Sequence, residues 1–489
     1  MDNLDVLMTV MPELVLAIST CALLLIGVFK GDKSLPLVVG GTGGALLGAL
    51  LVTFLEPDNI TMGIENRSLL ISDGYIRFAQ AVVLLLTFGG LLSSYRYLIR
   101  EKVGRFEYPI LIMISALGMI MLIAANDLLL FFVGLELQSL PVYILVAMLR
   151  NKSVTIEAAV KYFILGGLAT ILILYGASFI YGYTGTTEFY GIKAALESEP
   201  QIPYSVVWAL VLILAGMAFK ISAVPFHMWT PDVYEGAPTP VTLFIATAPK
   251  VAAMVFMIRF LFGPFADYVD IWQPLVQGLA ILSMLLGVFA ALFQTNLKRL
   301  LAYSAIAHVG YALIGVSCAS LEGVHSVLIY IVLYALMALG AFSCLMHLRR
   351  HGETPVHIND LKGLSKLNPH MALALAILMF SLAGIPPLAG FFAKFTVFLA
   401  AVDAGLYPLA ILGVLTTVIG ATYYLRIIKV MYFDGPVGGD ATLPYDRPLA
   451  RETALVIAVS AGLNLFYFLF PEPLVSQSEQ AATILFEQE

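Results

Sequence analysis

The sequence predicts an all-α, polytopic membrane protein. Of the 489 residues, 60% are hydrophobic and only 12% are charged, whereas about 25% are charged in an ordinary soluble domain. Apolar runs of about 20 residues, the length at which a helix crosses a bilayer, recur along the whole chain. No stretch is long and polar enough to fold as a separate soluble domain, so we expect residues 1–489 to form a single integral membrane domain.

A window of about 20 residues predicts about fourteen transmembrane helices. They are expected at about 12–30, 35–55, 77–97, 107–124, 127–149, 157–182, 204–223, 239–263, 271–294, 299–319, 325–348, 370–400, 405–432 and 452–470.

The basic residues indicate how these helices are oriented. Arginine and lysine gather in or beside the odd-numbered connections, for example at 96–105, 150–152 and 298–299. Such loops face the cytoplasm by the positive-inside rule. With an even number of helices, both termini are then expected on the noncytoplasmic side.

Signals for processing and for metal binding are missing from the sequence. The N-terminus has no basic region, and no small-residue cleavage site follows the first apolar run, so we expect the first helix to be kept. Cys21, Cys318 and Cys344 stand singly in apolar segments without ligand spacing. We interpret them as small buried hydrophobic residues and expect no metal site.

Two predicted helices contain proline where a membrane helix should be continuous. The first segment is Lys220-Ile-Ser-Ala-Val-Pro225-Phe-His227, and the second runs from Gly384 through Pro386 and Pro387 to Lys394. Proline leaves carbonyl groups without partners, which is tolerated at membrane depth only where protein or water satisfies them. We therefore expect both helices to be broken and to line a hydrated cavity.

The position of the breaks predicts an inverted repeat. The broken helices are the seventh and the twelfth, so units of five helices (4–8 and 9–13) must enter the membrane from opposite sides, as in many transporters. The chain then divides into three N-terminal helices (1–106), a first repeat (107–263), a second repeat (271–432) and a C-terminal helix with its tail (433–489). Asn126-Asp127 and Asn296-Leu-Lys298 give the best direct alignment between the repeats.

Four ionisable residues fall inside these apolar segments: Glu136, Lys220, Lys250 and Lys394. A charge near the bilayer centre costs about 2.5–3.5 kcal/mol on insertion scales. Such residues must face the protein interior, be paired or be hydrated, and they are candidates for an ion or proton pathway.

Several strings resemble the antiporter-like subunits of respiratory complex I, the proton-translocating NADH:quinone oxidoreductase. The longest runs from Phe219 to Val241 and includes Trp229-Thr-Pro231-Asp232-Val-Tyr234. Others are Gly134-Leu-Glu136, Thr247-Ala-Pro-Lys250, Gln294 through Ser304 leading to His308, and Ser381 through Lys394. Within this family the chain is most similar to the N-type subunit, because of the string Trp229-Thr-Pro-Asp-Val-Tyr234, the lysine at position 394 and the short C-terminal tail.

The resemblance implies a function and a set of partners. Glu136 pairs with Lys220, and a proton held on Lys220 and Lys250 passes to Lys394 and leaves on the noncytoplasmic side. NAD, FMN, iron–sulfur clusters and quinone belong to other subunits, and this chain has no redox centre of its own. K-type and M-type subunits are the implied neighbours, and a bacterial inner membrane is the implied location.

The roles of three further residues stay open. His227 either donates to a carbonyl freed by the broken helix or relays protons, and His308 is either a buried core residue or a relay residue. Lys161 follows Glu157 by one turn, which a structural ion pair explains well. Tyr303, Tyr423 and Tyr424 either hydrogen-bond water in the conduit or act as interfacial anchors, as tyrosines at helix ends more often do.

Three alternative functions remain. The chain could be a membrane subunit of a cation/proton antiporter, a spacer whose lysines stay permanently paired, or part of a quinone or small-molecule site. No nucleotide-binding loop, haem attachment site or catalytic Ser/His/Asp set occurs in the sequence, and no basic patch with aromatic residues indicates nucleic acid.

Overall fold

The computed structural model describes residues 9–55, 69–197, 202–348, 356–435 and 450–487. Within them the chain is built from helices. The longer helices are α2 (Met11–Lys30), α3 (Leu35–Leu55), α4 (Gly74–Arg100), α5 (Glu107–Ile123), α6 (Leu128–Val146), α7 (Ser153–Thr184), α9 (Tyr204–Ile221), α12 (Ala248–Phe262), α13 (Val269–Leu292), α14 (Leu297–Ser317), α15 (Leu321–His347), α17 (Pro369–Ala383), α18 (Ala389–Asp403), α19 (Tyr407–Tyr432), α20 (Arg451–Phe466) and α21 (Glu472–Glu487). The shorter ones are α8 (Phe189–Glu197), α10 (Trp229–Gly236), α11 (Thr239–Ala246) and α16 (Leu364–Leu367), with 3₁₀ turns at Gly31–Ser34, Ala266–Tyr268, Ile358–Leu361 and Tyr467–Leu469.

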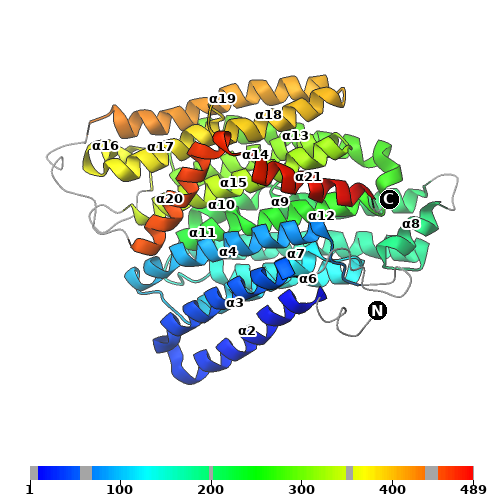
Figure 1. The fold of residues 1–489 in the computed structure, drawn as a ribbon, viewed down its shortest axis with the longest axis horizontal. Helices are drawn as coiled ribbons and strands as arrows, with labels where there is room; N and C mark the ends of the chain where they lie inside the picture. The colour runs from blue at the N-terminus through cyan, green and yellow to red at the C-terminus, as the bar shows by residue number, and fades with distance from the viewer. Residues whose placement is uncertain (1–8, 56–68, 198–201, 349–355, 436–449, 488–489) are drawn as a thin grey trace.

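The helices form one elongated bundle (Figure 1). The pair α2 and α3 forms one edge, and α18 and α19 form the opposite edge. Between them, α12, α14 and α15 bury nearly every residue. These three helices carry Lys250, His308 and Tyr330, so the centre of the bundle is both its most buried part and the place where ionisable groups occur.

Eleven helical stretches of the described chain are long and apolar enough to cross a membrane. The first joins α2 and α3 through a 3₁₀ turn at Gly31–Ser34, and the apolar helices α5 and α17 are shorter than the others. The multi-pass membrane architecture predicted from the sequence is therefore confirmed, while the count of fourteen spans stays a prediction.

Both predicted helix breaks are present. Helix α9 ends at Ile221, where Ser222 adopts a left-handed backbone with φ of 71°, and α17 ends at Ala383, before Gly384 with φ of 82°. The backbone N–H of Ala223 donates to Ala218 across the first break, as the N–H of Ile385 does to Phe380 across the second. The same hydrogen-bond pattern therefore ends the helix at both breaks.

Some elements differ from the sequence expectations. The predicted helix 239–263 is divided at Thr247 into α11 and α12, because Pro249 cannot donate to the preceding turn. Helices α8 and α21 were not predicted, since each is less apolar than a spanning helix. Cys21 is exposed on α2, contrary to the burial expected of it, whereas Cys318 and Cys344 are buried.

Two local features recur five predicted helices apart. Asp127 caps the start of α6 and bridges to Glu188, and Asn296 caps the start of α14 and bridges to His357. Close packing recurs as well: a Cβ on a glycine of α5 or α6 would meet the backbone of the other helix, and the same holds for α13 and α14. Both features support the predicted repeat.

Candidate functional site

Glu136 and Lys220 form the first part of the site. They lie on α6 and α9, and their closest charged atoms, Oε1 and Nζ, are 3.9 Å apart. Each also has a neutral partner, because Lys220 donates to the Ser139 hydroxyl at 2.8 Å and Thr170 donates to Glu136 at 2.6 Å. The lysine and the carboxylate are therefore close enough to attract each other, yet each is held by a hydroxyl group.

The spacing along α6 explains why these groups meet. Glu136, Ser139 and Tyr143 stand at i, i+3 and i+7, which places them on one face of a helix. The Tyr143 hydroxyl lies 3.4 Å from Nζ of Lys220, and its ring centroid is 5.9 Å away. The Lys220 side chain is 5% exposed and that of Glu136 is 19% exposed. The lysine is thus enclosed, whereas the carboxylate reaches toward the surface of the chain.

Lys250 is a buried ammonium group on α12. The residue is 2% exposed, and within the described part of the chain its Nζ has no hydrogen-bond partner. Its nearest aromatic contact is the Tyr234 ring, whose centroid is 5.5 Å away. Lys250 also lines a cavity of about 10 Å³ together with His308 and Tyr330, which is room for about one water molecule. A buried ammonium without a protein partner needs such a water or a changing charge state.

His308 on α14 is held through both ring nitrogens. Nδ1 lies 2.7 Å from the Tyr330 hydroxyl, and Nε2 lies 3.1 Å from the Tyr424 hydroxyl. Tyr424 in turn makes a short hydrogen bond with Ser304. His308 lines one small cavity with Lys250, and the centroid of the Tyr311 ring lies 5.9 Å from that of the imidazole and 5.0 Å from Nζ of Lys394. His308 is therefore connected to both lysines, with a hydroxyl group at each ring nitrogen.

Lys394 lies at the second helix break. Its Nζ donates to the carbonyls of Leu382 at 3.1 Å and Ala383 at 3.3 Å, the last turn of α17. The Tyr311 ring centroid is 5.0 Å from the same nitrogen. The carbonyls freed at the break thus accept from the lysine that follows it, a direct use of the unpaired groups expected at that position.

His227 lies apart from these groups, in the connection between α9 and α10. Its Nδ1 is buried without a partner among the described residues, and the neighbouring Pro225 and Met228 are exposed. The structure therefore does not place His227 beside Lys250 and His308.

Lys161 belongs to a charged network that links three helices. Its Nζ lies 2.7 Å from Glu157, as the i,i+4 spacing predicts, and 2.7 Å from Asp232 on α10. Asp232 also accepts from Arg299 on α14 at 2.7 Å. Burial disfavours the charged form of this carboxylate, but its hydrogen bonds to Lys161 and Arg299 outweigh that effect, so the pKa of Asp232 lies below its usual range.

Sequence reasoning missed most of the hydroxyl partners. Ser139, Thr170 and Tyr330 carry no motif that separates them from other polar residues in apolar helices. Tyr423 and Tyr424, for which interfacial anchoring is one interpretation, are instead buried in the protein at 3% and 1% exposure. Within the described residues, no group of three histidine, cysteine or acidic side chains could hold a metal ion.

The chain is similar to a known membrane family. The family model described as NADH:quinone oxidoreductase/Mrp antiporter, TM, matches residues 125–420. NADH-quinone oxidoreductase subunit N of Paramagnetospirillum magneticum is 47% identical over 488 residues, and the alignment covers 98% of each chain. The subunit N of Rhodospirillum rubrum is 48% identical over 475 residues, covering 97% of this chain and 96% of its own length.

Two solved structures share the fold. A chain of respiratory complex I from Thermus thermophilus, solved with aureothin bound, superposes with a TM-score of 0.79 at 32% identity, covering 95% of this chain and 98% of its own. A chain of the Mrp complex from a Dietzia species superposes with a TM-score of 0.86 at 22% identity, covering 99% and 98%. At that identity the second similarity shows the fold alone.

Proposed function

Because the chain belongs to the NADH:quinone oxidoreductase/Mrp antiporter membrane family, among relatives that are subunit N of NADH-quinone oxidoreductase, we propose that it is a proton-translocating module of that complex. Its part in the enzyme is translocation, while NADH oxidation and quinone reduction take place on other subunits. NAD, FMN, iron–sulfur clusters and quinone are accordingly assigned to those subunits.

The single observation that carries the proposal is the series of buried ionisable side chains through the bundle. Glu136 and Lys220 begin it, Lys250 and His308 share one small cavity, and Lys394 lies at the second break. A packed membrane core has no structural need for several separate charges, each of which costs free energy. A pathway that accepts and releases protons does need them.

Movement of Glu136 is the proposed switch. With the carboxylate near Lys220, the protonated ammonium is favoured, and with the carboxylate turned toward Thr170 the lysine more readily gives up its proton. Lys220 donates to the Ser139 hydroxyl at 2.8 Å. Neighbouring subunits would supply the energy by shifting the charge that Glu136 faces.

Release follows through the second half of the chain. The proton from Lys220 and Lys250 passes by way of His308 to Lys394 and leaves on the noncytoplasmic side. The hydroxyls of Tyr330 and Tyr424 contact the two imidazole nitrogens, so His308 can gain a proton at one nitrogen and lose one at the other. His227 keeps a proposed relay role only at the first break.

The location and neighbours follow from the same proposal. We place the chain in a bacterial inner membrane with both termini on the noncytoplasmic side, between K-type and M-type subunits. The Glu136 side chain is 19% exposed, which supports a neighbour on that face, since a charged side chain facing lipid is unfavourable.

Lys250→Met tests the relay against the spacer alternative. Methionine keeps the apolar stem and removes the proton-binding group, so we expect normal assembly with depressed NADH:quinone turnover and depressed proton pumping in sealed vesicles. Lys362→Met, at the basic end of the molecule, is the control and should pump normally. An unchanged proton-to-electron ratio at full turnover in Lys250→Met would support the spacer and contradict the relay.

A cation/proton antiporter is the second candidate, favoured by the family description, which includes the Mrp antiporter. Affinity purification of the chain from its native membrane separates the two. Recovery of hydrophilic NADH-oxidising subunits supports the proposal, and recovery of membrane subunits alone supports the antiporter.

A further inference from the structure

A second polar cavity lies outside the relay. Its volume is about 250 Å³, and its walls come from α4, the start of α7, the α10–α11 connection, the start of α14 and the end of α15. Tyr97, Lys152, Thr239 and Lys298 contribute polar side chains to it. The α6–α7 and α13–α14 connections at its walls are odd-numbered loops, rich in arginine and lysine, so the cavity belongs to the basic end of the molecule.

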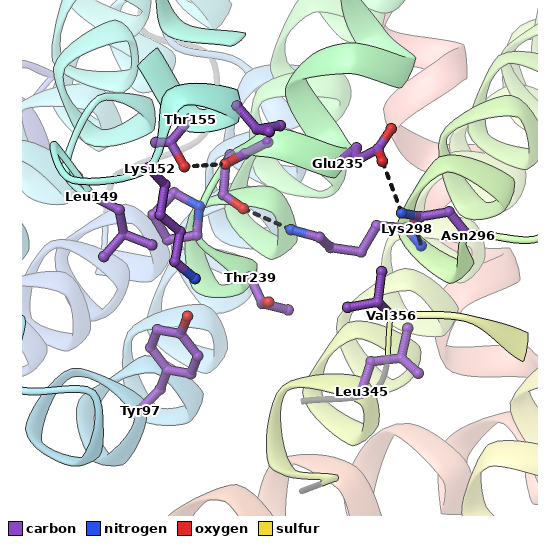
Figure 2. A pocket seen from close by; sticks show the side chains of 14 residues that line it. Tyr97, Leu149, Lys152, Thr155, Glu235, Thr239, Asn296, Lys298, Leu345 and Val356 are labelled. Carbon is purple, nitrogen blue, oxygen red and sulfur yellow. Dashed lines mark hydrogen bonds between the residues drawn. The ribbon is translucent and has the colours of Figure 1, made fainter. Parts of the chain in front are cut away.

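Two ammonium groups extend into the cavity. Figure 2 shows Lys152 and Lys298 reaching toward its centre from opposite walls. Lys298 donates one hydrogen bond to the Ala237 carbonyl at 2.7 Å, which leaves two of its three N–H donors for a ligand. Lys152 is exposed and has no ion pair with any residue that the structure describes.

Among the lining residues that the structure describes, one side chain is acidic, that of Glu235, and both of its oxygens have partners. Glu235 accepts from Asn296 through Oε1 at 3.0 Å and from Arg299 through Oε2 at 3.0 Å. Arg299 also donates to Asp232, so Glu235 shares this cation with a second carboxylate. Among the described lining residues, the two lysines still outnumber the single acidic side chain.

One helix adds to this positive potential. Helix α7 begins at Ser153 beside the cavity, and its start has no side-chain cap. The first turn of a helix presents free N–H groups and a partial positive charge. The hydroxyl of Tyr97, whose oxygen interacts with Thr239, is a further donor in the same wall.

We propose that this cavity binds a phosphate-class oxyanion. Lysine ammonium groups, a hydroxyl and an uncapped helix start are donors that bind such groups, and the cavity volume of about 250 Å³ is many times the roughly 10–15 Å³ that one water needs on the same measure. The ligand is the phosphate of an anionic lipid headgroup or free inorganic phosphate, which share this chemistry. The site is independent of the proton relay.

The test uses a cysteine as a local probe of charge. Val356 lines the cavity and is 47% exposed, so Val356→Cys is introduced into the assembled complex in phosphatidylcholine nanodiscs. Its peptide is followed by mass spectrometry during reaction with a sulfonate and with a trimethylammonium methanethiosulfonate reagent. We expect the sulfonate reagent to react more than about tenfold faster, because two lysines line the same cavity as Val356 and attract the negative reagent.

The variants assign the preference to the two lysines. In Lys152→Gln/Lys298→Gln the sulfonate and trimethylammonium reagents should react at nearly equal rates. Lys152→Gln alone should reduce the difference in rate partly, and its exposed position keeps folding undisturbed. Lys362→Gln/Lys366→Gln removes the same charge from the same end of the molecule and should leave the preference intact.

Protection of the introduced cysteine from the sulfonate reagent identifies the source of the oxyanion. Saturable slowing by inorganic phosphate indicates the free ion, and slowing in phosphatidylglycerol nanodiscs without added phosphate indicates a lipid headgroup. Equal rates in Val356→Cys, faster reaction of the cationic reagent, absence of protection by both ligands, or protection that persists in Lys152→Gln/Lys298→Gln would overturn the proposal.

Discussion

At the residue scale, Thr170 controls where Glu136 points. Its hydroxyl donates to Oε1 at 2.6 Å, while Lys220 lies 3.9 Å from the same oxygen. A hydrogen bond to a charged group contributes about 1.5–3 kcal/mol. In Thr170→Val the carboxylate loses this partner and settles on Lys220, so we expect NADH:quinone turnover to fall about tenfold or more with normal assembly.

Thr422→Val is the matched control, because that hydroxyl is exposed and donates only to the Ile419 carbonyl of its own helix. Its turnover should equal that of the native complex. Full turnover in Thr170→Val, measured in the same membranes, would mean that the position of Glu136 does not limit the pathway.

The site residues that could be predicted from the sequence are those whose type is rare in an apolar helix. One lysine in an apolar helix is visible because the cost of burying it is large, and this identified Lys250 and Lys394 from the sequence. Serine, threonine and tyrosine are common in such helices at little cost. Thr170 and Tyr330 therefore acquire their roles only from the packing of α6, α7, α14 and α15.

At the element scale, Gly390 fixes the start of α18 and with it Lys394. A Cβ at this position would lie 1.8 Å from the Ser381 carbonyl oxygen of α17, a backbone atom that cannot yield. Gly390→Ala should therefore push α18 from α17 and reduce the amount of assembled complex on native gels.

Gly278→Ala provides the comparison, since a Cβ on this α13 glycine meets nothing within 4 Å. Assembly of this variant should be normal. Equal assembly and turnover in Gly390→Ala and Gly278→Ala would show that the contact between α17 and α18 is not needed at the second break.

Asp232 connects α10 to the helices on both sides. It accepts from Lys161 of α7 and from Arg299 of α14, both at 2.7 Å. In Asp232→Asn both ion pairs are lost, and we expect faster hydrogen–deuterium exchange in α10. Glu157→Gln removes only the pair within α7 and should leave α10 protected. The same exchange in both variants would contradict a connecting role for Asp232.

A helix could be predicted from the sequence where both its length and its hydropathy were those of a membrane span. Proline and glycine marked both breaks, and apolar runs marked the long helices. Helices α8 and α21 escaped prediction because an amphipathic helix lacks the uniform hydropathy of a spanning one. The division at Thr247 could have been inferred from Pro249, since proline often begins a helix at its first turn.

At the scale of the whole molecule, the two ends of the described chain lie at one end of the bundle, and their place on the noncytoplasmic side stays a prediction. Helix α2 begins and α21 ends at the same end of the bundle, and the turn between α2 and α3, with Lys30 and Lys33, lies at the other (Figure 1). The relay crosses the middle of the bundle from α6 to α18, whereas the cationic cavity with Lys152 and Lys298 lies at the basic end. Proton transfer and oxyanion binding are thus proposed for separate places.

The central claim is that redox turnover drives protons through this chain. The most direct measurement compares Lys220→Ala and Lys394→Ala in the native complex, with assembly, NADH:quinone turnover and proton pumping followed in sealed vesicles. Normal assembly with turnover and pumping both depressed is the predicted result, because each alanine removes a proton-binding group from one half of the relay. Intact turnover with full pumping in both variants would contradict it.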